Sequence, residues 1–292
     1  TLRRRLQPEP EHRQAIRNAE GEITMDFLKR SLAPVTEQAW IEIDQHAKEV
    51  LTGILAGRRV VDVSSPKGWT CDAVGEGTLT LADESPVEGV NYGARDVLPL
   101  VEMRVPFTLP MWELDDIPRG RKTIDFSSLD AAARQAALFE DTAIFQGLED
   151  AGILGIEIEC DNDPVEFEQT NQGLINGVFL AIQNLTARNV GGPYMLVCSK
   201  DIWTFIRTDT SAYPLRKTLE NFVDKIVLSS QYETAFVCST RGDDAELILG
   251  QDFSIGFQSA TPTEVNFYIT ESFTFRVNSP EAFIELKAKK AE

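Results

Sequence analysis

Apolar residues recur at spacings of three and four in several long segments, a pattern typical of amphipathic helices. The first such segment covers about 36–56 and stops before Gly57. A second pattern predicts a long spine helix over about 128–151, which would end at Gly152. Alanines crowd one face of this helix, so another element is expected to pack closely against it. Shorter patterns predict further helices over about 164–187 and 215–223.

Strands are indicated where apolar and polar residues alternate. Residues 101–109 and 265–277 follow a period of two and predict long, half-buried strands. The polar, acidic segment 76–100 is flanked by strand patterns and predicts a projecting hairpin with little core of its own. Residues 1–24 have almost no apolar periodicity and are interpreted as an N-terminal extension, with a helix expected between Glu11 and Ala19.

These elements together predict an α+β protein of elongated shape. A long spine helix, extended strands and a projecting hairpin leave faces that a compact monomer does not bury. Burial of those faces against identical copies is the common solution, so self-association is favoured.

Composition narrows the class of protein. With 42% hydrophobic and 25% charged residues the chain is an ordinary globular one. Its 28 Lys and Arg stand against 46 Asp and Glu, a net charge of −18, and its basic clusters are short. Nucleic-acid binding, which needs clustered cations, is therefore disfavoured. No apolar run has the length of a membrane span and no signal-peptide pattern is present, so a cytoplasmic protein without a membrane partner is expected.

Cysteine and histidine usage argues against metal or nucleophilic chemistry. The candidates are Cys71, Cys160, Cys198, Cys238, His12 and His46. The cysteines show no paired spacing, so buried free thiols are a better interpretation than a metal site. A catalytic triad would depend on one of two histidines in unpromising contexts. The sequence therefore predicts no catalytic residues, no metal and no enzyme activity.

The chain resembles the encapsulins, shell proteins with the HK97-type phage capsid fold, from Met25 to its C-terminus. The matching segments, in family order, are MDFLKRSLAPVTEQAW (25–40), GRRVVDV (57–63), GW (68–69), RDVLPLVEMRVPFTLPMWELDD (95–116), SSLDAAARQAALFEDTAIFQG (127–147), GPYMLV (192–197), YPLRK (213–217), LILGQDFSIGF (247–257) and ITESFTFRV (269–277). The first and the GQDFSIG segments are specific to encapsulins rather than to phage capsids in general.

The resemblance implies a domain organisation for the whole chain. An N-terminal arm, a helix and the start of a peripheral domain would cover 25–75, and an extended loop 76–105. The peripheral domain with its spine helix would continue over 106–154, an axial domain would cover 155–245, and 246–292 would return to the peripheral domain. Residues 1–24 precede the usual family start and would form an interior arm or the end of a fused cargo-type domain.

The resemblance also implies a groove that binds the C-terminal peptide of a cargo enzyme. Its walls would be formed by one helix and one strand, with charged residues at the rim. The candidate residues are Val50, Leu51, Ile54, Leu55, Arg58, Asp62, Phe253, Ile255 and Phe257. The alternatives are that the helical stripe is ordinary core and that Arg58 and Asp62 form a structural ion pair.

Two further sites are expected on the same resemblance. An axial loop would line a pore for ions or small substrates, and side chains there would set its width and polarity. The pore candidates are Asp209, Thr210, Ser211, Ala212 and Tyr213. Trp112 is a candidate for stacking on a planar ligand such as a flavin, with packing at a subunit edge as the alternative. No other cofactor is expected.

The predicted function is a self-assembling icosahedral nanocompartment of about 60 or more copies. It would enclose cargo such as a ferritin-like protein, which stores iron, or a dye-decolourising peroxidase. One alternative is a phage major capsid protein that packages DNA. A less favoured one is a secreted antibacterial or peptidase-type protein, which the missing signal pattern and the histidine count oppose.

Overall fold

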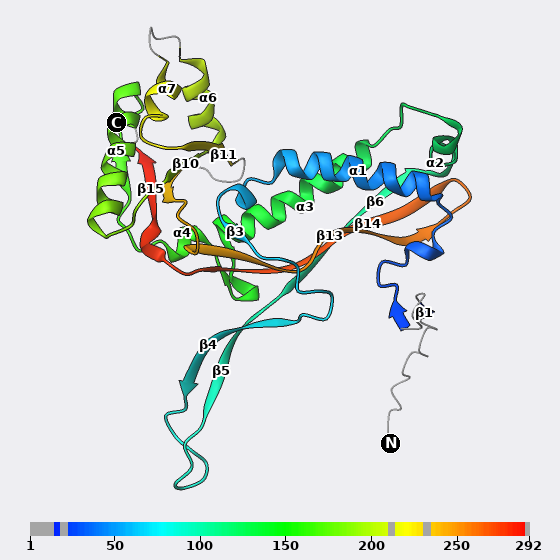
Figure 1. Cartoon of the computed structure of the whole chain (residues 1–292), viewed down its shortest axis with the longest axis horizontal. Coiled ribbons are helices and arrows are strands. Elements are labelled where there is room, and N and C mark those ends of the chain that lie inside the picture. The colour runs from blue at the N-terminus through cyan, green and yellow to red at the C-terminus, as the bar shows by residue number, and fades with distance from the viewer. Residues whose placement is uncertain (1–14, 18–22, 210–213, 230–234, 290–292) are drawn as a thin grey trace, which may run out of the picture.

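A computed structural model describes residues 15–17, 23–209, 214–229 and 235–289. The chain folds around two hydrophobic cores, and the larger one joins the five-stranded sheet to one end of the four-stranded sheet. Figure 1 shows the two parts joined by long strands, with a hairpin projecting from the body.

One half of the chain is built on a four-stranded sheet in the order β3-β13-β14-β6. Its strands are β3 (Asp62–Val63), β6 (Val101–Pro110), β13 (Ala245–Ala260) and β14 (Glu264–Val277). Helices α1 (Glu37–Ile54) and α3 (Ser127–Phe145) pack against each other, and α3 contacts β6 and β14 (Figure 1). The side chain of Thr36 caps α1 by accepting the N–H of Ala39 at 3.2 Å. His46 Nε2 and Asp130 Oδ1 lie 2.6 Å apart and join the two helices.

The second half is built on a five-stranded sheet in the order β11-β10-β12-β15-β9. Its strands are β9 (Val165–Phe167), β10 (Tyr194–Cys198), β11 (Lys225–Leu228), β12 (Ala235–Ser239) and β15 (Phe283–Ala288). The helices here are α4 (Ile156–Glu159), α5 (Asn171–Ala187), α6 (Lys200–Thr208) and α7 (Leu215–Leu219). Strand β15 lies in this sheet, whereas the predicted organisation assigned all of 246–292 to the peripheral domain.

A two-stranded hairpin of β4 (Ala73–Leu81) and β5 (Gly93–Pro99) projects from the body (Figure 1). It exposes large apolar side chains, namely Leu79, Leu81, Val87, Val90, Tyr92 and Val97. The whole chain exposes 17946 Å², nearly half as much again as the roughly 12,000 Å² of a compact monomer of this mass. The predicted elongated shape is present (Figure 1), and the exposed apolar side chains of the hairpin are of the kind that self-association buries.

The helix predicted over 215–223 ends at Leu219, two other predicted helices have different limits, and the N-terminal one is not observed among the described residues. The spine helix ends at Phe145, because Gly147 adopts φ +93° and starts the short hairpin β7 (Gly147–Leu148) and β8 (Ile153–Leu154). The helix predicted from 164 begins at Asn171, after β9. The N-terminal helix is wrong where the structure describes it, since β1 (Ala15–Arg17) pairs with β2 (Ile23–Met25).

Candidate functional site

The predicted cargo residues come from α1 and β13, and the structure brings these two elements into one hydrophobic core. Three of the apolar candidates are buried, namely Leu51, Leu55 and Ile255. The other four remain partly exposed and pack against that core: Val50 and Ile54 from α1, Phe253 and Phe257 from β13. We call these four side chains the α1–β13 seam. Among the seven apolar candidates, the buried three therefore support the seam, and its four members are the ones accessible to a ligand.

The segment that precedes α1 also lies against the seam. The N–H of Phe257 donates to the carbonyl of Leu28 at 2.8 Å, and the Phe27 ring stacks on Trp69 with centroids 4.9 Å apart. The prediction missed this contribution, although the adjacent apolar pair Phe27 and Leu28 in a polar stretch could have indicated it. One side of the seam is thus formed by the segment around Leu28, which precedes α1, rather than by α1 alone.

Arg58 follows α1 in the short 3-10 turn η2 (Gly57–Arg59) and holds a cluster of carboxylates. Its guanidinium lies 2.7 Å from Glu140 Oε2, 2.5 Å from Glu271 Oε1 and 2.9 Å from Asp252 Oδ1. It also lies over the Phe253 ring, 4.8 Å from the centroid. Asp62 instead accepts the N–H of Asp243 at 2.6 Å. The predicted alternative of an Arg58–Asp62 ion pair is therefore wrong, because nearer and more buried carboxylates hold the arginine.

Burial dominates the electrostatics of this cluster. The side chains of Glu140 and Glu271 are both 0% exposed. The pKa of Glu271 is raised well above its usual range, first by burial and then by the neighbouring Glu140. Asp141 accepts the N–H groups of Gly57 at 2.7 Å and Ala56 at 3.2 Å, yet burial raises its pKa to about 6. Two acidic residues of α3 therefore secure the end of α1.

The pore candidates fall largely outside the described residues. Thr210, Ser211, Ala212 and Tyr213 are not described, and Asp209 directly follows α6. One carboxylate oxygen of Asp209 accepts from the side-chain amide of Asn171 at 2.9 Å, and the other accepts the N–H of Leu215 at 2.7 Å. Asp209 thus links the end of α6 to the start of α5 and the start of α7 within one chain.

Trp112 lies on the short helix α2 (Met111–Asp116), at the end of β6, with 76% of the residue exposed. Its neighbour Glu113 pairs with Arg121 at 2.8 Å and accepts the N–H of Asp125 at 3.0 Å. The indole is thus exposed next to a residue that two contacts hold in place, and it can stack on a ligand or pack on a neighbouring subunit. Flavin binding stays a prediction.

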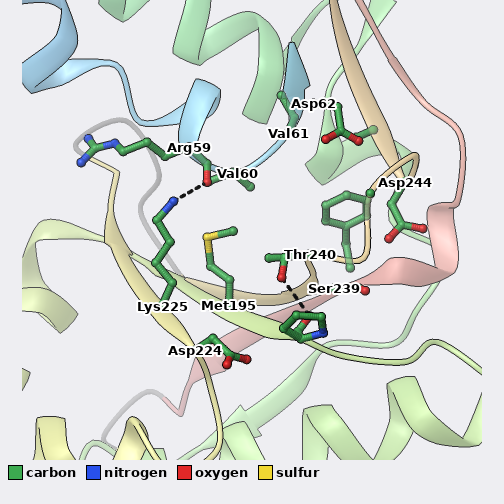
Figure 2. A pocket seen from close by; sticks show the side chains of 14 residues that line it. Arg59, Val60, Val61, Asp62, Met195, Asp224, Lys225, Ser239, Thr240 and Asp244 are labelled. Atoms are coloured by element: carbon green, nitrogen blue, oxygen red, sulfur yellow. Dashed lines mark hydrogen bonds between the residues drawn. The ribbon is translucent and has the colours of Figure 1, made fainter.

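A cavity of about 460 Å³ lies between the two sheets (Figure 2). Asp62, one of the predicted cargo residues, lines this cavity rather than the seam. Lys225, on β11, reaches across one side and donates from Nζ to the carbonyl of Arg59 at 3.0 Å (Figure 2). The cavity thus marks the joint between the two halves of the subunit.

The structure adds little that suggests further chemistry. Among the described residues no group of three or more His, Cys, Asp and Glu side chains is arranged to hold a metal ion. In the same part of the chain, no helix combines the length and apolar character needed to cross a bilayer. Of the four free thiols, Cys198 and Cys238 are buried, and burial raises the pKa of Cys198 to about 12. Cys71 and Cys160 are partly exposed, so the prediction of buried thiols is confirmed only for the first pair.

Comparison with known proteins decides the family. The model of a family described as encapsulating protein for peroxidase matches residues 25–274. A type 1 encapsulin shell protein of Mycobacterium tuberculosis is 38% identical over 264 residues, which cover 90% of this chain and 99% of that protein. The chain belongs to the encapsulin family.

Solved structures agree on the fold. A virus-like particle protein from Pyrococcus furiosus superposes with a TM-score of 0.61 at 15% identity, covering 85% of this chain and 99% of that one. A protein of Mycobacterium phage Bobi superposes with a TM-score of 0.56 at 11% identity, covering 82% of this chain and 91% of that one. The predicted α+β, HK97-type capsid fold is therefore confirmed.

Family membership also fixes the broad function. Encapsulins are self-assembling shell proteins and not enzymes, so this chain is a structural shell subunit, as predicted. The phage proteins are alike in fold alone, whereas the encapsulin relative is alike in sequence over nearly its full length. The encapsulin interpretation thus prevails over that of a phage capsid or a secreted antibacterial protein.

Proposed function

We propose that the shell built by this chain holds a cargo enzyme through a short apolar peptide that binds at the α1–β13 seam. The observation that carries the proposal is the exposure of Val50, Ile54, Phe253 and Phe257 beside the fully formed core they rest on. Apolar side chains that remain accessible around one buried core are typical of peptide-binding surfaces.

The seam favours an extended peptide with small and aliphatic residues. Four apolar side chains, two aliphatic and two aromatic, provide contact area but few directional groups. Arg58 cannot serve as a free charge for the peptide, since its guanidinium already binds three carboxylates. Asp252 is the rim group with solvent access, because its side chain is 45% exposed. A disordered peptide rich in Leu, Ile and Gly that orders on binding fits these features.

The family description supports a choice of cargo class. The matching family is described as encapsulating a peroxidase, so a peroxidase is the first candidate cargo and a ferritin-like protein the second. Small substrates would enter through openings lined by the loop that follows Asp209, as the predicted pore requires. The copy number of about 60 or more remains part of this proposal.

Charged substitutions in the seam test cargo binding. Val50→Asp or Ile54→Asp places a carboxylate where the peptide would bury apolar surface, which removes about 1.5–3 kcal/mol of contact energy. Cargo per shell should then fall about tenfold or more. The measurement is quantitative mass spectrometry of shells purified from the native host, with negative-stain micrographs to establish that shells still form.

The matched control is Thr52→Asp, which introduces the same charge at an exposed position of the same helix. Cargo retained at the wild-type level in both seam variants would refute the proposal. Shells of normal size that contain nucleic acid instead of an enzyme, seen in their ultraviolet absorbance, would favour the phage-capsid function.

A further inference from the structure

Two fully buried glutamates share one arginine beneath the seam. Glu140, on α3, and Glu271, on β14, are 0% exposed, and both bind the guanidinium of Arg58. Asp252, on β13, is the third carboxylate on this guanidinium and lies nearest to solvent. Asp141 lies next to Glu140 and faces Arg59. If all of these acids were ionised, the buried part of the cluster would carry more negative than positive charge, which is unfavourable in a core.

The hydrogen bonds of the two glutamates are unequal. Glu140 accepts from Arg58 Nε with both carboxylate oxygens, at 3.1 and 2.9 Å. Glu271 accepts from Arg58 Nη2 with Oε1, while its Oε2 is buried without any hydrogen-bond donor. A buried carboxylate oxygen that accepts no hydrogen bond is rare, and it demands an explanation.

A proton on Glu271 supplies that explanation. A carboxylic acid is a donor as well as an acceptor, so the orphan oxygen would become an O–H group. Glu140 is close enough to interact with Glu271 through a side-chain hydrogen bond, and its oxygens can accept this proton. The two fully buried glutamates then carry one negative charge, which balances Arg58; Asp252 is partly exposed and Asp141 is attracted by Arg59.

We infer that Glu271 is a neutral carboxylic acid in the folded subunit at neutral pH, and that its O–H group donates to Glu140 and so positions Arg58 and Phe253 at the seam. Glu271 is therefore a positioning residue that does not itself touch the peptide. Only the last step, from Phe253 to cargo, depends on the proposed function.

The electrostatics agree with this assignment and fix its direction with pH. Burial and the negative charge of Glu140 raise the pKa of Glu271, and Arg58 opposes them without cancelling them. Raising the pH therefore removes the shared proton and leaves two adjacent buried carboxylates. Their repulsion would loosen the contacts of Arg58, whose guanidinium stacks on Phe253.

Infrared spectroscopy of assembled shells tests the protonation state. A protonated, solvent-excluded carboxyl group gives a carbonyl stretch that is separate from the amide band. At neutral pH wild-type shells should show this signal. In Glu271→Gln, whose side-chain amide keeps a hydrogen-bond donor, the intensity of the signal should be lower by one carboxyl group per subunit. The control is Glu246→Gln, since Glu246 on β13 pairs with Arg276 at 2.8 Å but is partly exposed. The signal should persist in that variant.

The pH profile provides a second readout that a purely structural role would not change. In wild-type shells the signal should disappear as the pH rises, and hydrogen–deuterium exchange over 50–60 and 251–257, corrected for intrinsic rates, should accelerate over the same range. In Glu271→Gln this acceleration should be absent. A wild-type signal that is missing at neutral pH, or that survives in Glu271→Gln, would overturn the inference. If Glu271→Gln does not assemble, the wild-type titration alone decides.

These measurements need no cargo, so their failure is distinguishable from failure of the proposed function. Loss of the carboxyl signal with unchanged cargo per shell at alkaline pH would overturn the link from Glu271 to the seam. The seam variants Val50→Asp and Ile54→Asp test peptide binding independently of any proton.

Discussion

A methyl group added at Gly57, in the turn η2 after α1, would meet side chains of α3. A Cβ at this position would collide with Ile144 Cδ1 and lie 3.1 Å from Asp141 Oδ1. Ile144 is 0% exposed, so its side chain cannot move without displacing other core residues. Gly53, one helical turn earlier, has no atom within 4 Å of the equivalent Cβ. The two glycines therefore form a matched pair for substitution by alanine.

The expected effects have opposite signs. Overpacking of a core costs about 1–3 kcal/mol, and the reduced entropy of the unfolded chain returns about 0.4–1 kcal/mol. Gly57→Ala should thus destabilise the subunit by about 1–2 kcal/mol. Gly53→Ala lies inside a helix and should stabilise it by about 0.5–1 kcal/mol, since alanine is the better helix former.

Thermal unfolding of assembled shells, at matched protein concentration and scan rate, measures both effects. For domains of about 150–250 residues each kcal/mol shifts the midpoint by about 2–4 °C, so Gly57→Ala should unfold roughly 2–8 °C below wild type. Gly53→Ala should unfold slightly above it. A midpoint for Gly57→Ala at or above that of wild type would refute the packing argument.

Two further predictions concern charge. Because each subunit carries a net charge of −18, shells should loosen at low ionic strength or at high pH. At low salt the repulsion is less screened, since the Debye length rises from about 3 Å at 1 M salt to about 30 Å at 0.01 M. Light scattering that shows one unchanged shell size across this salt range would contradict the prediction. The pKa of Asp141 is raised to about 6, so folding favours the protonated form of this side chain. The free energy of unfolding should therefore fall by roughly 3 kcal/mol as the pH rises from about 4 to 6. Asp141→Asn should remove this part of the pH dependence of the urea midpoint, and a slope identical to wild type would disprove the assignment.

The elements that bury only one face were predictable from the sequence. The alternating pattern located β6 and β14 nearly to the residue, and the three-and-four spacing located α1. Periodicity alone did not indicate β13, because much of this strand is buried on both faces and Gly250 and Gly256 interrupt it. Only the resemblance to encapsulins pointed to that segment.

The candidate site was predictable in outline but not in its charges. The resemblance selected a helix and a strand that share one core, yet it could not separate the supporting Leu51 from the accessible Val50, since both belong to one helical stripe. Nor did it find Glu140 and Glu271, which lie far apart in the chain and meet only in the folded subunit. Glu140 does fall on the apolar face of α3, four residues after Ala136. An acidic residue at such a position is a signal that sequence reasoning can use.

The cavity crossed by Lys225 and Arg59 has a consequence for the geometry of closed containers. The void lies on the Lys225 side of the junction, while Leu247 and Phe273 of the four-stranded sheet pack into the core of the five-stranded one. Lys225 bonds a backbone carbonyl at the end of a long side chain, so this contact tolerates small shifts between the two sheets. We therefore expect the subunit to adjust its curvature slightly, which quasi-equivalent positions in containers larger than the simplest icosahedron demand of identical building blocks.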